Sequence, residues 1–225
     1  MKVVRILRNI VLGLFLSSIL LVILYRFVPV YITPLMIIRV AEQVADGKPI
    51  RLERGWVPID EISPKMVRAV IASEDNLFLD HYGFDIEGMK KAFENNKKGE
   101  KLKGGSTISQ QTAKNVFLTP SRTYVRKALE AYFTVLIEIF WSKERIMEVY
   151  LNVIEMGNGI YGIEKASEIY FNKPPQKLTS FQAALVAASL PNPRKYSITH
   201  PGPYMRKRQA HILWLMPKLG KIEFE

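Results

Sequence analysis

The sequence predicts a mainly α-helical protein, in which one N-terminal transmembrane helix precedes a helical domain. Three observations support this class. The stretch IVLGLFLSSILLVILY, residues 10–25, carries no charge. Downstream, apolar residues recur at three- and four-residue spacing, as they do on one face of a helix. Several of these segments begin at capping residues or end before glycine or proline, and no convincing β-hairpin signal is evident.

The composition limits both the chemistry and the partners. The chain has 225 residues, 48% of them hydrophobic, which is enough for one or two domains with a sizeable core. It has no cysteine, which excludes disulfides, thiolate metal sites and cysteine nucleophiles. The formal charge of +11 implies an anionic partner, which is nucleic acid, acidic lipid or a phosphorylated substrate.

Residues 10–31 are predicted to form the transmembrane anchor, with residues 1–9 on the cytoplasmic side. The uncharged stretch is slightly shorter than the roughly 20 residues that a bilayer requires. Continuation through FVPVYI closes this gap if Arg26 extends its charge toward the interface. Positive charges lie on both sides of the span, so the positive-inside rule favours a cytoplasmic N-terminus only weakly.

A cleaved signal peptide is the alternative to an anchor. Cleavage requires small residues after the apolar run, whereas this run leads into the bulky segment YRFVPVYITP. An uncleaved anchor is therefore preferred. The next apolar segment, ITPLMIIRV, is expected either to rest on the membrane surface or to pack into the domain.

The domain is predicted to span residues 45–225 and to consist of successive helices. One helix covers residues 63–75, a second begins near Ser106 or Thr107, and a third runs from residue 124 to 140. Further helices are expected in KERIMEVYLNV, IEKASEIYF, FQAALVAASL and PYMRKRQAHILWLM. Capping signals mark several starts, namely Ser142 and the pairs Thr107 with Gln110 and Thr179 with Gln182. FENNKKGEKLKGG is expected to be a mobile loop, and the glycines of EMGNGIYG interrupt the helical pattern.

Two carboxylates, Glu74 and Asp75, end the helix over residues 63–75. Acids at a helix C-terminus oppose the helix dipole, which favours cations there. They also lie beside the apolar residues Leu77 and Phe78. A pair of acids in such an unfavourable place indicates a functional role.

The segment KKGEKLKGGSTISQQTAKN has two glycines, Gly99 and Gly104, at the spacing of a phosphate-binding P-loop. Gly105 then occupies the position of the P-loop lysine, and no strand is evident before the segment. A nucleotide-binding P-loop is therefore not expected. A broader anion-binding role is still favoured, because a new helix begins here with free N–H groups.

Amide and cationic side chains gather on this helix and just after it, at Gln110, Gln111, Lys114, Asn115, Arg122, Arg126 and Lys127. A solvated polar helix is the alternative, because an i,i+4 pair such as Arg126 with Glu130 is common on exposed helices. Together with Glu74, however, the set predicts a cationic cleft that contains two carboxylates.

The sequence offers no metal or acyl-transfer motif. His81, His200 and His211 are scattered and lack the spacing of a metal site. Asp80 and Asp85 flank His81 and are able to orient its ring, although a packed or surface histidine is the preferred interpretation. A G-x-S-x-G elbow is missing, which argues against an acyl hydrolase.

Five blocks of the sequence stand out: SEDNLFLDHYGFD, GGSTISQQTAKN, RKALE, KERIMEVYLNVIEMGNGIYGIEKAS and AALVAASLPNPRKYS. They cover most of residues 60–197, and the first two together are highly specific. In this order the blocks resemble the monofunctional peptidoglycan glycosyltransferases, relatives of the glycosyltransferase domain of bifunctional penicillin-binding proteins. The SxxK, SDN and KTG motifs of transpeptidases are missing, so a monofunctional enzyme is expected.

The resemblance implies a lysozyme-like, two-lobed helical fold. It also implies that lipid II, a disaccharide-pentapeptide on undecaprenyl diphosphate, is polymerised into the glycan strands of peptidoglycan. Glu74 matches the catalytic general base, and Glu130 matches a second catalytic glutamate near the diphosphate. Leu129 stands where some relatives have a lysine, so that cationic contact is either absent or supplied by Lys127. Positions attributed to substrate binding match Ser106, Thr107, Gln110, Gln111, Lys114, Asn115, Arg122, Arg126 and Lys127.

The implied reaction is an inverting transfer that forms a β-1,4 link and releases undecaprenyl diphosphate. A base takes the proton of the incoming hydroxyl, and cations stabilise the departing diphosphate. The resemblance also implies that Mg²⁺ or Mn²⁺ assists, without an organic cofactor. The expected partners are lipid II, the growing glycan chain, membrane lipids and other cell-wall synthesis and division proteins. The expected location is the bacterial cytoplasmic membrane, with the domain on the periplasmic or extracellular side.

Two other functions compete with this reading. A lysozyme-like lytic enzyme acting on finished peptidoglycan is the nearest alternative, because fold does not fix function. Such an enzyme has no need for the cations around GGSTISQQTAKN, since it cuts neutral glycan. A membrane-tethered nucleic-acid binder is compatible with the charge of +11, but no base-stacking stripe of aromatic residues is evident. A nucleic-acid partner is therefore not expected.

Overall fold

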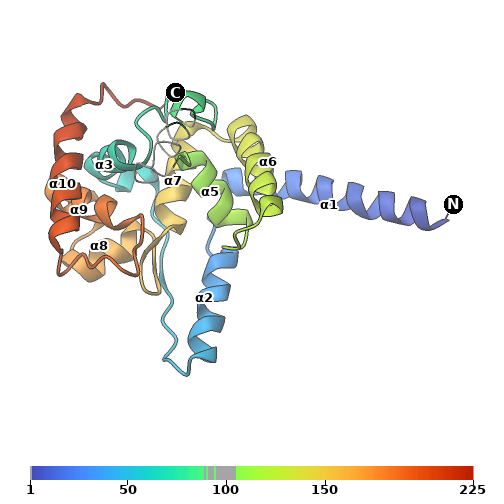
Figure 1. Ribbon diagram of the computed structural model, residues 1–225, viewed down its shortest axis with the longest axis horizontal. Helices are drawn as coiled ribbons and strands as arrows, with labels where there is room; N and C mark the ends of the chain where they lie inside the picture. Colours follow the sequence, from blue (N-terminus) through green and yellow to red (C-terminus); the bar gives the residue numbers. More distant parts are fainter. Residues whose placement is uncertain (1, 89, 91–93, 95–104, 225) are drawn as a thin grey trace.

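The structure is a computed structural model that describes residues 2–88, 90, 94 and 105–224. Helices dominate the described residues, which confirms the predicted mainly α class (Figure 1). The α-helices are α1 (Lys2–Phe27), α2 (Pro34–Ala45), α3 (Pro64–Glu74), α5 (Ile108–Phe117), α6 (Tyr124–Phe140), α7 (Lys143–Val153), α8 (Ile163–Phe171), α9 (Ser180–Ser189) and α10 (Pro203–Leu215). Short 3₁₀ turns cover Ile59–Glu61, Pro175–Lys177 and Met216–Lys218. The segment FENNKKGEKLKGG, expected as a mobile loop, lies outside the described residues apart from its second and last positions.

Helix α1 projects from the domain as a long rod (Figure 1). Its length and apolar composition are sufficient to cross a membrane. The helix ends at Phe27, earlier than the predicted anchor boundary at residue 31. Pro29 accounts for this end, because it lacks an N–H group and disfavours helical geometry at the residue before it.

The C-terminal half of α1 packs against α6 and the start of α7. The indole nitrogen of Trp141 donates to the Val22 carbonyl oxygen at 2.8 Å. The hydroxyl oxygens of Ser18 and Tyr132 are also 2.8 Å apart. Val22 is buried, whereas most α1 side chains are exposed. The apolar helix is therefore attached to the domain by specific contacts as well as by the chain itself.

Helix α2 carries the second apolar segment, ITPLMIIRV. Thr33 caps it by accepting from the Met36 N–H at 3.4 Å, and Pro34 suits the first turn. Met36 is buried, but Ile37 is 61% exposed. The segment thus packs into the domain with one face and leaves apolar side chains exposed on the other.

Two groups of helices flank α7 (Figure 1). Helices α3, α9 and α10 pack together in one group, and α5 packs on α6 in the other. Tyr150 and Met147 of α7 are fully buried between them. The side chain of Asn152 binds both the N–H and the carbonyl of Val57 at 2.9 Å, which ties α7 to the chain that leads into α3. This arrangement brings the end of α3 to the start of α5.

A small three-stranded sheet corrects one expectation. β2 (Glu155–Gly157) pairs antiparallel with β3 (Ile160–Tyr161), and β3 pairs in parallel with β1 (Glu53–Arg54). A hairpin therefore forms in EMGNGIYG, where no convincing β-hairpin signal is evident in the sequence. Gly159 makes the turn possible, because its φ is +69° and a Cβ there would lie 2.4 Å from the carbonyl oxygen of Arg51.

The predicted helix starts are confirmed at both capping boxes. Thr107 accepts from the Gln110 N–H, and the Gln110 side chain accepts in return from the Thr107 N–H. Thr179 and Gln182 exchange the same pair of bonds at α9. Helix α6 also begins and ends at its predicted residues. Local signals therefore position the elements that carry the site.

Candidate active site

Glu74 is the last residue of α3, and its carboxylate joins the two groups of helices. Its Oε1 atom accepts from the Ser73 hydroxyl at 2.8 Å and from the Arg208 guanidinium at 3.1 Å. Its Oε2 atom accepts from the side-chain amide of Gln111 at 3.1 Å. The side chain is 12% exposed. Glu74 is thus fixed by residues from α3, α5 and α10, and sequence analysis missed the arginine among them.

Gln111 is held at both ends of its amide and presents a fixed donor to Glu74. The amide oxygen accepts from the Tyr150 hydroxyl at 3.3 Å, while the nitrogen donates to Glu74. Burial raises the pKa of Tyr150 well above its ordinary value, and the charges of Glu74 and Asp75 raise it further. Tyr150 therefore remains a neutral donor and keeps the amide in this orientation.

Asp75 caps the next helix. Its buried carboxylate accepts from the Ile108 N–H at 3.0 Å. An anion is favourable at the N-terminus of α5, because the first N–H groups and the helix dipole attract negative charge. The unfavourable position of Asp75 at the end of α3 is thus offset at the start of α5. A structural role explains this acid, whereas Glu74 has no such cap to make.

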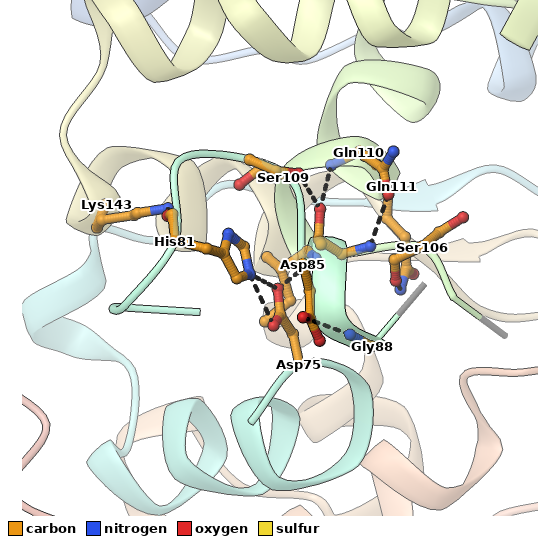
Figure 2. A network of polar contacts seen from close by, with 12 residues as sticks. Asp75, His81, Asp85, Gly88, Ser106, Ser109, Gln110, Gln111 and Lys143 are labelled. Atoms are coloured by element: carbon orange, nitrogen blue, oxygen red, sulfur yellow. Dashed lines mark hydrogen bonds and ion pairs between the residues drawn. The ribbon is translucent and has the colours of Figure 1, made fainter. Parts of the chain in front are cut away.

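His81 is packed, as the preferred interpretation had it, and its ring pairs with Asp75. The Nε2 atom lies 2.9 Å from Asp75 Oδ1 (Figure 2). Asp85, which sequence analysis considered as an orienting acid, instead accepts from the Gly88 N–H at 2.7 Å. Lys143 donates to the His81 carbonyl at 2.6 Å. These contacts fix residues 81–88, which follow α3 in the chain.

The predicted substrate-binding residues around α5 divide into two sets. Thr107 and Gln110 are buried, and their polar atoms serve the capping box. Thr107 also donates to the Gly83 carbonyl at 2.6 Å. The carbonyl of Ser106 accepts from the Gln111 amide at 3.4 Å. The other set lines a cavity, and it consists of Gln111, Lys114 and Asn115.

The cavity has a volume of about 430 Å³ and lies between α5, the start of α6, α2 and the loop after α9. It borders Gln111, the residue that holds Glu74. Its polar lining is rich in cations. The charged and polar side chains that line it are Arg39, Gln111, Lys114, Asn115, Ser121, Arg122, Arg126, Tyr150, Glu155, Asn192 and Arg194.

Arg39 and Arg194 are cavity cations that sequence analysis missed. They come from α2 and from the loop after α9, and both lie near Glu155. Arg39 Nε is 3.7 Å from a carboxylate oxygen of Glu155. Burial raises the pKa of Glu155, and the two arginines lower it. No local sequence pattern predicts that these three segments meet, so only the fold shows that Arg39, Arg194 and Glu155 lie together.

Glu130 is buried in α6, at 2% exposure. Arg126 donates to it at 2.5 Å, and Lys127 forms a second ion pair with it. The pair Arg126 with Glu130 is therefore not the exposed helix pair that the alternative interpretation required. Burial lowers the pKa of Lys114, and the charge of Glu130 raises it. Glu130 thus acts as the counter-ion of Arg126 and Lys127.

The arrangement places a shielded carboxylate in contact with Gln111, which lines a cavity rich in cations. A carboxylate oxygen with a spare lone pair is able to accept a proton from a sugar hydroxyl. Arginine and lysine side chains are able to stabilise an anionic leaving group such as a diphosphate. The same small region therefore contains the two kinds of group that transfer from a phosphorylated sugar donor requires.

Comparisons with known proteins point to the same chemistry. Residues 42–217 match a family model described as Transglycosylase. A biosynthetic peptidoglycan transglycosylase of Bacteroides thetaiotaomicron is 53% identical over 225 residues, which cover 99% of this chain and 91% of that protein. One of Caulobacter vibrioides is 55% identical over 212 residues, with 92% and 90% covered. One of Shewanella oneidensis is 46% identical over 217 residues, with 96% and 92% covered. The chain belongs to the transglycosylase family.

Proposed function

We propose that the chain is a peptidoglycan glycosyltransferase that polymerises lipid II into glycan strands and releases undecaprenyl diphosphate. Family membership and the names of the relatives support this activity. One structural observation carries the proposal. Gln111 contacts the Glu74 carboxylate and also lines the cationic cavity. One bound substrate is therefore able to contact both Glu74 and the cations of the cavity.

Glu74 is the general base in this proposal. Its Oε2 atom takes the proton of the acceptor 4-hydroxyl while the hydroxyl oxygen bonds to C1 of the donor sugar. The bond from C1 to the diphosphate oxygen breaks, and its electron pair leaves with the diphosphate. Attack from the side opposite the leaving group turns the α-linked donor into a β-1,4 link. The diphosphate is already anionic, so it needs no protonating acid of the kind that glycoside hydrolysis uses.

The cationic wall receives the leaving group. Lys114, Arg122 and Arg126 line the cavity and provide positive charge for the diphosphate oxygens. Glu130 holds Arg126 in place without a substrate, which keeps the donor groups preorganised. Burial disfavours the charged form of Lys114 in the free enzyme, and a bound diphosphate offsets that cost. Both glutamates are thus needed, one for the proton and one for the cations.

A resident metal site does not fit the described residues. In the ranges that the structure describes, no group of three or more His, Asp or Glu side chains comes together as metal ligands. Mg²⁺ is commonly held by one or two carboxylates together with substrate phosphates. We therefore propose that an assisting divalent cation enters together with the diphosphate. The protein's own lysine and arginine residues stabilise the negative charge of the leaving group.

The apolar helix α1 is consistent with a single-pass membrane anchor. We propose that it spans the bacterial cytoplasmic membrane, with residues 1–9 inside and the domain of residues 45–225 on the periplasmic or extracellular side. A lipid-linked substrate is confined to the bilayer, so an attached enzyme meets it in two dimensions. Membrane lipids, the growing glycan chain and other cell-wall synthesis and division proteins are the proposed partners.

The experiment that tests the proposal uses the full-length protein in detergent with labelled lipid II. Growth of glycan chains is the expected result. Release of fragments from purified sacculi, without chain growth, would instead support a lytic enzyme. A parallel reaction with a chelator shows whether a divalent cation contributes to the rate.

A further inference from the structure

Arg208 lies in the middle of α10, and its guanidinium reaches the end of α3. The Nη2 atom is 3.1 Å from Glu74 Oε1 and 2.9 Å from the Ser73 hydroxyl oxygen. Helix α10 packs on both α9 and α3, as the outermost helix on that side of the molecule (Figure 1). The residue at the centre of the proposed chemistry is thus in contact with a cation from a distant segment.

The contacts give the two oxygens of Glu74 different surroundings. Oε1 accepts from Ser73 and Arg208, whereas Oε2 accepts from the neutral amide of Gln111 beside the cavity. Oε2 is therefore the oxygen whose partner lines the cavity. We propose that Arg208 is a positioning residue for glycosyl transfer, which fixes Glu74 through Oε1 and so holds Oε2 in place for the incoming hydroxyl. This inference rests on the proposed role of Glu74 as the base.

The charges around Glu74 single out Arg208 as its main cationic partner. The guanidinium of Arg208 is 3.1 Å from Glu74 Oε1, and a planar guanidinium is well suited to orient a carboxylate. Asp75 is the neighbouring anion, while Tyr150 of α7 remains neutral. Lys114 of α5 interacts with Glu74 more weakly than with Glu130. From α9, only the Ala187 carbonyl reaches this point among the described contacts, through Ser73.

A second nitrogen of the Arg208 guanidinium also argues for a functional placement. Its Nε atom is buried and has no hydrogen-bond partner among the described residues. A buried donor without a partner costs free energy, so this arginine is not placed for stability alone. Its position is explained if the contact with Glu74 Oε1 is the one that matters.

The test is the split of kcat and KM for lipid II polymerisation by the full-length protein. Arg208→Met removes the contact that fixes Glu74 Oε1, so the carboxylate no longer holds Oε2 in one orientation. The kcat is expected to fall by about tenfold or more, with KM for lipid II within a few-fold of the unmodified enzyme. Arg208→Gln, which keeps hydrogen-bonding capacity without charge, is expected to lower kcat less than Arg208→Met does, and it serves if Arg208→Met does not fold. Lys207→Met removes an exposed charge from the adjacent position and is the matched control, with an unchanged kcat.

A double variant separates this inference from the proposed function. If Arg208 acts through Glu74, Glu74→Gln with Arg208→Met is as slow as Glu74→Gln alone. A Glu74→Gln enzyme that retains its rate refutes the proposed function itself. The inference about Arg208 is overturned if Arg208→Met leaves kcat unchanged. It is also overturned if that variant only raises KM for lipid II, which would make Arg208 a substrate ligand.

Discussion

Glu74 and Glu130 are both glutamates near the same cavity, but their surroundings suit them to different tasks. Glu130 has a 3% exposed side chain and pairs with Arg126 and Lys127 of its own helix. Glu74 is 12% exposed, and its partners come from three helices. Partners one turn away neutralise both oxygens of Glu130. Partners from the tertiary fold leave Glu74 one oxygen that faces a neutral amide, and this difference separates the proposed base from the counter-ion.

The largest expected effect is on the rate of the Glu74→Gln variant. The amide keeps the shape of the side chain, but it has one acceptor oxygen in place of two and takes no proton, so polymerisation should fall by about 10²–10⁴-fold. The rate is measured with labelled lipid II, and circular dichroism checks that the helices persist. Glu168→Gln changes an exposed glutamate that pairs with Lys165 and should leave the rate unchanged.

Glu130→Gln should reduce stability more than any exposed charge change. Removal of one partner from a buried ion pair costs about 3 kcal/mol, because the remaining cations lose their counter-ion. For a domain of this size, that corresponds to a decrease in Tm of roughly 6–12 °C. Thermal unfolding in detergent measures it, and Glu168→Gln should shift Tm by about 2 °C or less because exposed pairs contribute little. Equal shifts for the two variants would show that Glu130 is not the counter-ion described above.

Loss of the Lys114 proton at alkaline pH should weaken diphosphate binding by the cationic wall. Burial lowers the pKa of Lys114 below its ordinary value of 10.5. Between its folded pKa and 10.5 the unfolded chain binds more protons than the folded one, so this group favours folding increasingly as pH rises through that window. Diphosphate binding weakens over the same window, and kcat/KM should decline below pH 10.5. Lys114→Arg keeps its charge and should move the decline to higher pH; superimposable profiles would exclude Lys114 as the cause.

The smallest effects are expected at the two capping boxes, which begin at Thr107 and Thr179. Thr107→Ala and Thr179→Ala each remove an N-cap, and each should lower the free energy of unfolding by about 1 kcal/mol. Thr107 also bonds Gly83 and starts the helix that carries Gln111, so its loss should reduce the polymerisation rate as well. Thr179 starts α9 and should affect stability alone. The account is weakened if both variants keep full activity.

Local patterns predicted most of the helices, because capping and apolar periodicity depend on residues only a few positions apart in the sequence. Thr107, Ser142 and Thr179 cap as their neighbours indicated. The hairpin in EMGNGIYG was not predicted, since its strands are very short and β3 also needs the distant partner β1. Local sequence carries no sign of that pairing.

Some residues of the candidate site were likewise predicted from the sequence, and others were not. Motif resemblance placed Glu74 and the cations of α5 and α6 in one region, and the structure brings Lys114, Arg122 and Arg126 to one cavity. Arg208 and Arg39 were not predicted, because each reaches the site from a segment far along the chain. Glu74 and Asp75 are adjacent in sequence, yet only the fold places one against the cavity-lining Gln111 and the other at a helix cap.

The central claim is that Glu74 takes the proton while Glu130 organises the cations. The most direct test is the split of kcat and KM for lipid II in the Glu74→Gln and Glu130→Gln variants, measured side by side. The account predicts that Glu74→Gln loses kcat with KM within a few-fold of the unmodified enzyme, whereas Glu130→Gln mainly raises KM. A Glu74→Gln enzyme with near-normal kcat, or a loss confined to KM, would contradict it.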